Sequence, residues 1–195
     1  MKRYLFLALL LAAAAIFCIG CIQKVPTEEP VEEDGGVQDN SNPDAPKIIE
    51  STFIINFQCE FSAMDRTEED TYLSGKNYRL EAALKNGAVK GNYHSYGGYD
   101  AEEDTLFSAD HSFMYKLQEV VSRYDLAQYN GTDIFVSGLP EMYGVSLQIV
   151  YASGEHICAS NNQDCFLPLE AMEELETLFR QQLPKPPAAV DAAEE

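Results

Sequence analysis

Cysteine is the residue type in this sequence whose chemistry depends most clearly on its position. The chain has 195 residues and five cysteines, of which Cys18 and Cys21 lie in an apolar N-terminal stretch. Cys158 and Cys165 are close enough in sequence to form a disulfide, which would close a short loop and stabilise the fold modestly. Cys59 falls within an alternating apolar pattern, so we expect a small buried thiol there. Three cysteines outside the leader are too few for a disulfide scaffold.

The first 20 residues have the composition of a secretory signal. A positively charged start precedes an apolar run that ends at Gly20-Cys21. The end of this run resembles a bacterial lipobox, in which a small residue precedes a lipidated cysteine. Cys21 has such a residue before it, whereas Cys18 follows a bulky phenylalanine. We therefore predict a lipoprotein signal peptide over residues 1–20 and lipidation at Cys21.

The alternative is an uncleaved membrane anchor. The apolar run over residues 4–22 is about long enough to span a bilayer core. Under both interpretations, positive charge precedes the run and acidic residues follow it, which places the rest of the chain outside the cytoplasm. We expect a bacterial protein on the extracytoplasmic face of the cell membrane, attached to that membrane through a lipid anchor.

Acidic residues dominate the charge of the chain. There are 32 Asp and Glu against 13 Lys and Arg, a net charge of −19. This field repels phosphate backbones, so we expect no nucleic-acid partner. Residues 21–46 are rich in proline and acids and lack aromatic side chains, which predicts a disordered acidic tether. Residues 184–195 predict a disordered tail, and residues 47–183 remain as one globular domain.

Alternating apolar residues predict strands in the first half of this domain. One such pattern places Phe53, Ile55 and Phe57 on a buried face. A second pattern contains Asn86-Gly87, which is typical of a two-residue hairpin turn. Folding about that turn places four pairs of residues opposite each other: Leu84 and Val89, Ala82 and Gly91, Leu80 and Tyr93, and Arg79 and His94.

A second hairpin is expected around Ala152-Ser153-Gly154. A three-residue loop with Gly154 in the left-handed conformation gives the better register. In that register Ile157 and Ala159 lie on the apolar face, and His156 and Cys158 face outward. We choose this register because it buries the more apolar pair.

Two amphipathic helices complete the predicted elements. The first covers Ser112–Asp125, where Asp110 can cap its start, and the second opens at Pro168. With a short strand at residues 134–136, these elements predict an α+β fold of two layers. It consists of an antiparallel sheet of about five strands with both helices on one face. The acids that we expect on the solvated face of the second helix are Glu170, Glu173, Glu174 and Glu176.

Between the first hairpin and the first helix, Asn92–Asp104 is rich in tyrosine, glycine and acids, which predicts a loop. Tyrosines on such a loop can stack on a sugar ring or grip a peptide. Its acids could gather calcium, but they lack the spacing of a calcium-binding loop, so we expect no metal site. The predicted ligand-binding surface combines this loop with the outer sheet face, and its residues are Tyr93, Tyr96, Tyr99, Arg79 and His94.

The sequence lacks the common catalytic motifs. It has no Gly-x-Ser-x-Gly, no His-Glu-x-x-His and no phosphate-binding P-loop. His94, His111 and His156 lie far apart on different elements, so they do not suggest a shared metal ion. We therefore assign no catalytic residue and no cofactor.

Five short segments in the second half of the domain carry a family resemblance: Tyr124-Asp125-Leu126-Ala127, Tyr129-Asn130-Gly131, Gly138-Leu139-Pro140, Tyr151-Ala152-Ser153-Gly154-Glu155 and Ala171-Met172-Glu173. Over residues 117–179 the chain resembles a domain of uncharacterised lipoproteins from Gram-positive anaerobic bacteria. The resemblance implies a location and a class of protein, and it carries over no catalytic residue.

These observations predict a membrane-anchored lipoprotein with a non-catalytic binding domain for an unknown envelope ligand or protein. An alternative is an enzyme that hydrolyses an envelope polymer with two carboxylates among Asp100, Glu102, Asp104 and Asp110. A third hypothesis is an inhibitor or assembly factor for a secreted partner.

Overall fold

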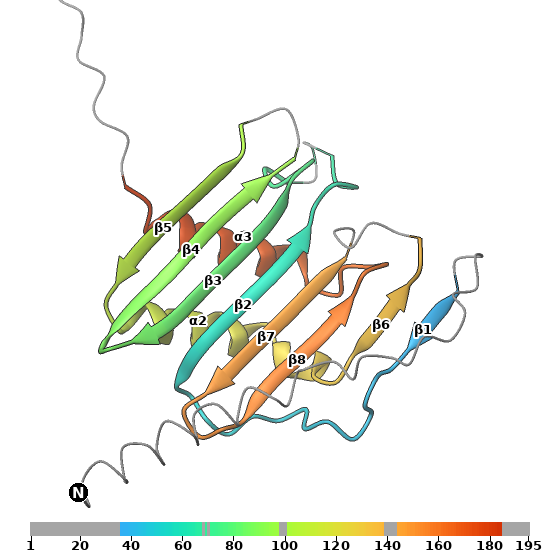
Figure 1. Cartoon of the computed structure of the whole chain (residues 1–195), viewed down its shortest axis with the longest axis horizontal. Helices are drawn as coiled ribbons and strands as arrows, with labels where there is room; N and C mark the ends of the chain where they lie inside the picture. Colours follow the sequence, from blue (N-terminus) through green and yellow to red (C-terminus); the bar gives the residue numbers. More distant parts are fainter. Residues whose placement is uncertain (1–35, 68, 70, 98–100, 139–143, 185–195) are drawn as a thin grey trace, which may run out of the picture. The chain divides into compact units, whose positions relative to one another are not determined.

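The computed structural model describes residues 36–67, 69, 71–97, 101–138 and 144–184. Within these ranges, one sheet contains eight strands in the order β1-β6-β8-β7-β2-β3-β4-β5 (Figure 1). Neighbouring strands are antiparallel except for β6 and β8, which are parallel. The strands are β1 (Val37–Asp39), β2 (Ile54–Ser62), β3 (Asn77–Lys85), β4 (Ala88–Tyr96), β5 (Glu103–Ala109), β6 (Asp133–Val136), β7 (Val145–Tyr151) and β8 (His156–Asn161).

Both long helices cover the same face of this sheet (Figure 1). They are α2 (Ser112–Arg123) and α3 (Leu169–Arg180), and the short 3-10 helix η2 (Leu126–Tyr129) follows α2. The α+β class is confirmed, and the sheet is larger than the predicted five strands. The predicted signal peptide, Cys21 and most of the predicted tail lie outside the described residues. Within the described residues, no helix is long and apolar enough to cross a membrane.

Strand β1 lies within the stretch that was expected to be a disordered tether. Val37–Asp39 pairs with β6. Past the strand, the backbone N–H of Asn40 donates to Asp133 O at 2.8 Å, and that of Asn42 donates to Gly131 O at 2.7 Å. This pairing uses backbone groups, which a stretch without aromatic side chains still possesses. The folded part of the chain therefore includes residues 36–46.

Strand β5 replaces part of the loop predicted over Asn92–Asp104. Strand β4 continues to Tyr96 and β5 begins at Glu103, so the connection is shorter than expected. Among the residues of β5, only Phe107 is buried. An edge strand with one buried side chain does not show the clear apolar alternation that identifies a strand in a sequence.

The two hairpins have the predicted registers. Leu84 lies opposite Val89, and Arg79 lies opposite His94. The turn between them places Asn86-Gly87 at positive φ, as a two-residue turn of this type requires. In the second hairpin, Gly154 has φ +92°. Ile157 and Ala159 are buried in the predicted register, whereas His156 and Cys158 lie on the outer face.

The alternation predicted for β2 is correct only from Phe57 onward. The register with β7 shifts between Ile54 and Asn56, as at a β-bulge. The shift turns the chain by one residue, so Ile54 is buried in place of Ile55. The side chains of β2 beyond this point alternate as expected.

The core lies between the sheet and the two helices. Phe179 of α3 is at its centre, with ring contacts to Phe57, Phe107 and Phe113. The ring of Phe107 lies over Gly91, where an added Cβ would be 2.2 Å from the ring. This close approach accounts for a glycine in the middle of β4.

Candidate functional site

The outer face of the sheet, which no described helix covers, brings together three of the five predicted binding residues. Arg79, His94 and Tyr96 project from the β3–β4 hairpin onto this face. The guanidinium of Arg79 donates two hydrogen bonds to the carboxylate of Glu60, at 3.1 and 3.2 Å. The Tyr96 hydroxyl donates to the same carboxylate at 3.0 Å. We call these residues, with Glu60, the outer patch.

His94 joins the outer patch through two further contacts. Its ring lies 4.8 Å from the Tyr96 ring, centroid to centroid. Its Nε2 atom is 2.8 Å from Oε1 of Glu102. Alternate residues of β4 therefore present an imidazole and a phenol side by side, held by carboxylates from β2 and from the β4–β5 connection.

Glu60 shifts the pKa values of both groups that it binds. Its hydrogen bond and its charge raise the pKa of the Arg79 guanidinium, so this residue stays a cation. Burial and the charge of Glu60 raise the pKa of the Tyr96 phenol above its ordinary range. At neutral pH the patch therefore offers a permanent cation and a neutral hydroxyl.

Tyr93 does not belong to the predicted binding surface. Its side chain is fully buried on the helix side of the sheet, on the face opposite His94 and Tyr96. The predicted surface treated Tyr93 and Tyr96 as one group, but residues an odd number of positions apart on a strand point to opposite faces. Tyr99 lies outside the described residues.

The acidic residues next to the tyrosines have several different partners. Asp104 lies opposite His94 in the β4–β5 ladder, and Asp100 lies outside the described residues. Glu102 binds His94, whereas Glu103 lies 3.7 Å from Arg180 of α3, across the sheet edge. Asp110 accepts a hydrogen bond from the Ser112 backbone N–H at 2.7 Å, at the start of α2. No group of three His, Cys, Asp or Glu side chains in the described part of the chain could hold a metal ion.

Cys158 and Cys165, which were proposed as a disulfide, lie on different faces of the sheet and are not bonded to each other. Cys158 is opposite Gln148 on the outer face. Cys165 lies on the helix side, where its Sγ is 3.6 Å from Sδ of Met172. Burial raises the pKa of the Cys165 thiol to about 11, and burial also raises that of Cys59, so both stay protonated. Their spacing in the sequence did not indicate that a sheet separates Cys158 from Cys165.

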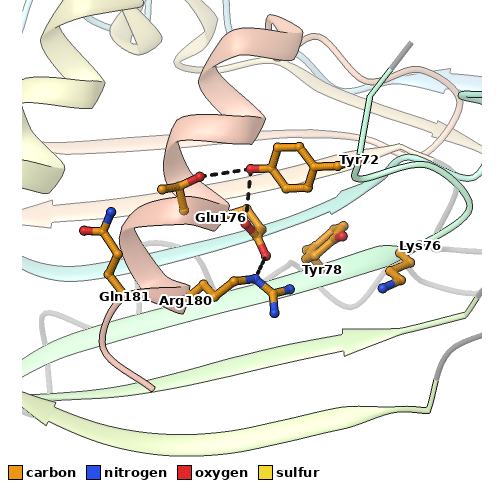
Figure 2. Close-up of a pocket in the computed structure, with 7 residues that line it drawn as sticks. Tyr72, Lys76, Tyr78, Glu176, Arg180 and Gln181 are labelled. Carbon is orange, nitrogen blue, oxygen red and sulfur yellow. Dashed lines mark hydrogen bonds and ion pairs between the residues drawn. The ribbon is translucent and has the colours of Figure 1, made fainter. Parts of the chain in front are cut away.

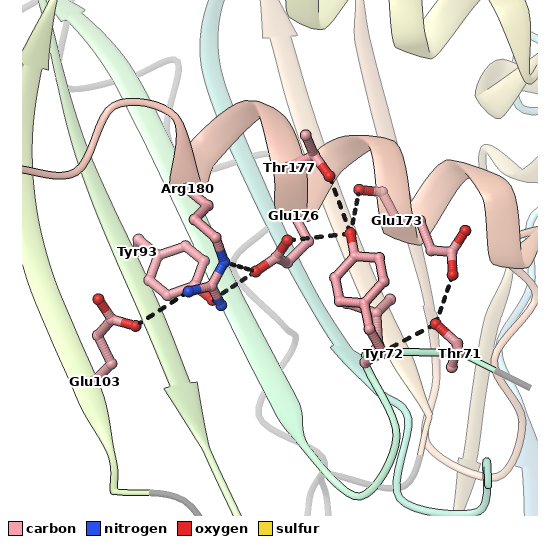
Figure 3. A network of polar contacts seen from close by, with 9 residues as sticks. Thr71, Tyr72, Tyr93, Glu103, Glu173, Glu176, Thr177 and Arg180 are labelled. Atoms are coloured by element: carbon pink, nitrogen blue, oxygen red, sulfur yellow. Dashed lines mark hydrogen bonds and ion pairs between the residues drawn. The ribbon is translucent and has the colours of Figure 1, made fainter. Parts of the chain in front are cut away.

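A second polar group lies on the helix side, around Glu176 of α3. Glu176 was predicted on the solvated face of the helix, but its side chain is 1% exposed. Figure 3 shows that it accepts hydrogen bonds from Tyr93 at 2.8 Å and from Arg180 Nε at 2.5 Å. Arg180 also donates to the Tyr93 hydroxyl. We call Tyr93, Glu176 and Arg180 the inner triad.

The inner triad extends toward the loop before β3. The Tyr72 hydroxyl lies 3.2 Å from the second Glu176 oxygen and 3.0 Å from the Thr177 hydroxyl. Burial, followed by the hydrogen bond and charge of Glu176, raises the pKa of Tyr93. The hydrogen bond to Glu176 also raises the pKa of Arg180, although burial opposes this. The Glu176 carboxylate is thus engaged as an acceptor on both oxygens, by Tyr93 and Arg180 on one and by Tyr72 on the other.

An open hollow of about 490 Å³ borders this group (Figure 2). Its walls come from α3 and from residues 72–78 before and within β3. Both oxygens of Glu176, which lines the hollow, already have donors. The residues that line it are Tyr72, Lys76, Tyr78, Glu176, Thr177, Arg180 and Gln181.

One signal in the sequence could have identified the inner triad. Glu176 and Arg180 are four residues apart, the spacing at which helix side chains pair. The burial of Glu176 depends on Tyr93, which is distant in sequence and reaches α3 only after the sheet forms.

Comparisons of the chain with protein-family models, with curated proteins and with solved structures found no match. The resemblance to lipoproteins of Gram-positive anaerobes stays a prediction.

Proposed function

We propose that this protein is a non-catalytic binding protein of the bacterial cell envelope. It is anchored through a lipid on Cys21 and contacts an envelope component with the outer patch. The observation that carries the proposal is the arrangement of Arg79, His94 and Tyr96 on the uncovered face, where Glu60 holds two of them. Such a preorganised cation and aromatic pair loses little side-chain entropy on binding.

The lipid anchor rests on the leader sequence. Its apolar run and the small residue before Cys21 support export and lipidation. Mass spectrometry of the mature N-terminus tests this part. We expect a diacylglyceryl thioether on Cys21, lost in Cys21→Ala and kept in Cys18→Ala. An intact Met1 in the membrane-bound protein would contradict it.

The envelope-polymer hydrolase is less well supported. That alternative needs two carboxylates from the acidic segment in one pocket. Of the four carboxylates named for it, Asp100 lies outside the described residues. Glu102 already binds His94, and Asp104 lies opposite His94 on the exposed outer face. Asp110 is occupied at the start of α2. The engagement of Glu102 and Asp110 weighs against a free catalytic pair formed by these residues.

Binding by the outer patch can be tested against a matched control on the helix side. Arg123 and Tyr124 both bind the Glu174 carboxylate, so they repeat the Arg–Glu–Tyr chemistry elsewhere. We expect Arg79→Gln with Tyr96→Ala to lose retention of the full chain on isolated envelope fractions. Arg123→Gln with Tyr124→Ala should keep it.

Two results would decide against the proposal. Equal retention of both double variants would remove the outer patch as the binding surface. Capture of one secreted protein, with no retention on polymer or lipid fractions, would favour the inhibitor or assembly factor. Repeating the pull-down with membranes stripped of protein distinguishes capture of a protein partner from binding to the membrane itself.

A further inference from the structure

Strand β5 ends the sheet and leaves one of its edges open in the described part of the chain. It has seven residues, and β4 pairs with its other edge along the whole length. Its central residue, Leu106, points to the outer face and is 79% exposed. A regular edge strand with a large exposed apolar side chain at its centre is a template for pairing with another strand.

We propose that the second strand is β5 of another copy of this chain. The two strands would run antiparallel about a two-fold axis that passes between the two Leu106 residues. In this register Asp104 lies opposite Ser108 of the second copy, and Glu103 lies opposite Ala109. The residues of the strand pair with one another in a self-complementary way, as a two-fold interface requires.

Charge favours this register. The ammonium of Lys90 on β4 reaches across to Ser108 and donates to its hydroxyl at 2.8 Å. Asp104 of the second copy would lie directly beyond that hydroxyl, one strand spacing from the ammonium. Each Asp104 of the dimer thus gains a cation, and the contact occurs twice by symmetry.

Other symmetric registers are worse. Side chains alternate along a strand. A symmetric pairing that keeps both outer faces on the same side of the joined sheet must therefore have its two-fold axis at a residue. An axis at Asp104 would place two carboxylates opposite each other. An axis at Thr105 would place Asp104 against Leu106, and an axis at Phe107 would place Leu106 against Ser108. Within the seven residues of β5, the Leu106 axis pairs the two exposed leucines with each other and places no acid opposite another acid.

The opposite edge of the sheet is a weaker candidate. Strand β1 has three residues, all exposed, and offers a short ladder. Pairing through β5 would instead join two sheets into one continuous surface, with an outer patch from each copy on the same side. The dimer does not depend on the binding function proposed above, because it rests only on the geometry of β5.

Crosslinking tests the register directly. The full chain carrying Leu106→Cys, solubilised in mild detergent and treated with a mild oxidant, should form a disulfide-linked dimer. Paired Cα atoms lie within disulfide reach, whereas the two Ser108 positions would be about 14 Å apart. Ser108→Cys, also exposed on β5, is therefore the matched control, and the wild-type chain accounts for the native cysteines.

A second variant tests the contact without any new cysteine. Leu106→Glu places two like charges on the axis and leaves an exposed position that the fold does not need. Sedimentation should show a concentration-dependent dimer for the wild type and a loss of at least about tenfold in its association constant for this variant. Equal crosslinking at positions 106 and 108, or a wild-type chain that stays monomeric, would overturn the proposal.

Discussion

The outer patch contains the three residue types of the inner triad, tyrosine, glutamate and arginine, on the opposite face of strand β4. In each, a tyrosine of β4 donates to a glutamate that also binds an arginine. The two glutamates differ in exposure: the side chain of Glu60 is 32% exposed and that of Glu176 is 1% exposed. The same hydrogen bonds therefore occur in two very different solvent environments.

This difference in burial separates a polar group that stabilises the fold from one whose side chains are available to a ligand. A buried carboxylate must keep its partners, since removing one leaves a charge without solvation. A half-exposed carboxylate can exchange a protein partner for water at little cost. We infer that the inner triad joins α3 to β4, whereas the outer patch can yield its arginine and tyrosine to a ligand.

The largest effect is expected from Arg180→Met. This substitution keeps the apolar stem and leaves Glu176 buried without its cation. We expect the free energy of unfolding to fall by about 3 kcal/mol. Urea denaturation of the variant and the wild type measures this change. A loss below that of Arg79→Met would show that burial does not distinguish the two groups.

Tyr93→Phe should have an intermediate effect. It removes the hydroxyl that donates to Glu176 and accepts from Arg180, and it leaves the ring in place. We expect a loss of about 1–3 kcal/mol, the cost of leaving a buried polar group without its partner. Tyr96→Phe is the matched substitution on the outer face. Equal losses of unfolding free energy for the two variants, measured by urea denaturation, would contradict the inferred difference between the outer patch and the inner triad.

Alkaline pH gives a second test of Tyr93→Phe. Burial and Glu176 raise the pKa of Tyr93 in the folded protein, whereas an unfolded tyrosine ionises near pH 10. The resulting stability is complete below about pH 10 and declines as the pH rises further, because the unfolded state then binds fewer protons. We expect Tyr93→Phe to lose stability less steeply than the wild type above pH 10, as followed by denaturation at fixed temperature.

Local patterns predicted the hairpins because each turn restricts its own register. Asn86-Gly87 and Gly154 adopt the positive φ that the sequence indicates, and the buried faces follow from that. Both helices were also predictable from their apolar spacing. Strands β1 and β5 were missed because edge strands are held by backbone pairing and bury few side chains.

The candidate site was predictable only where residues share one hairpin. Arg79 and His94 are opposite in the predicted register, so their proximity follows from the turn. Glu176 looked like one of several solvated acids on α3. Its burial depends on Tyr93, and the two are brought together by packing between a helix and a strand that are distant in sequence. Periodicity within one segment contains no information about such a contact.

The smallest effect on stability should come from Arg79→Gln. This variant is the most direct test of the difference between the outer patch and the inner triad. The Arg79 side chain is 46% exposed, so solvent screens its ion pair with Glu60. We expect a change in the free energy of unfolding of about 0–1 kcal/mol. The same variant should nevertheless weaken retention on envelope fractions, which Arg123→Gln should leave unchanged. Retention that falls while urea stability stays constant would separate a binding role from a structural one. A parallel loss of both would instead assign Arg79 to the fold, as we assign Arg180.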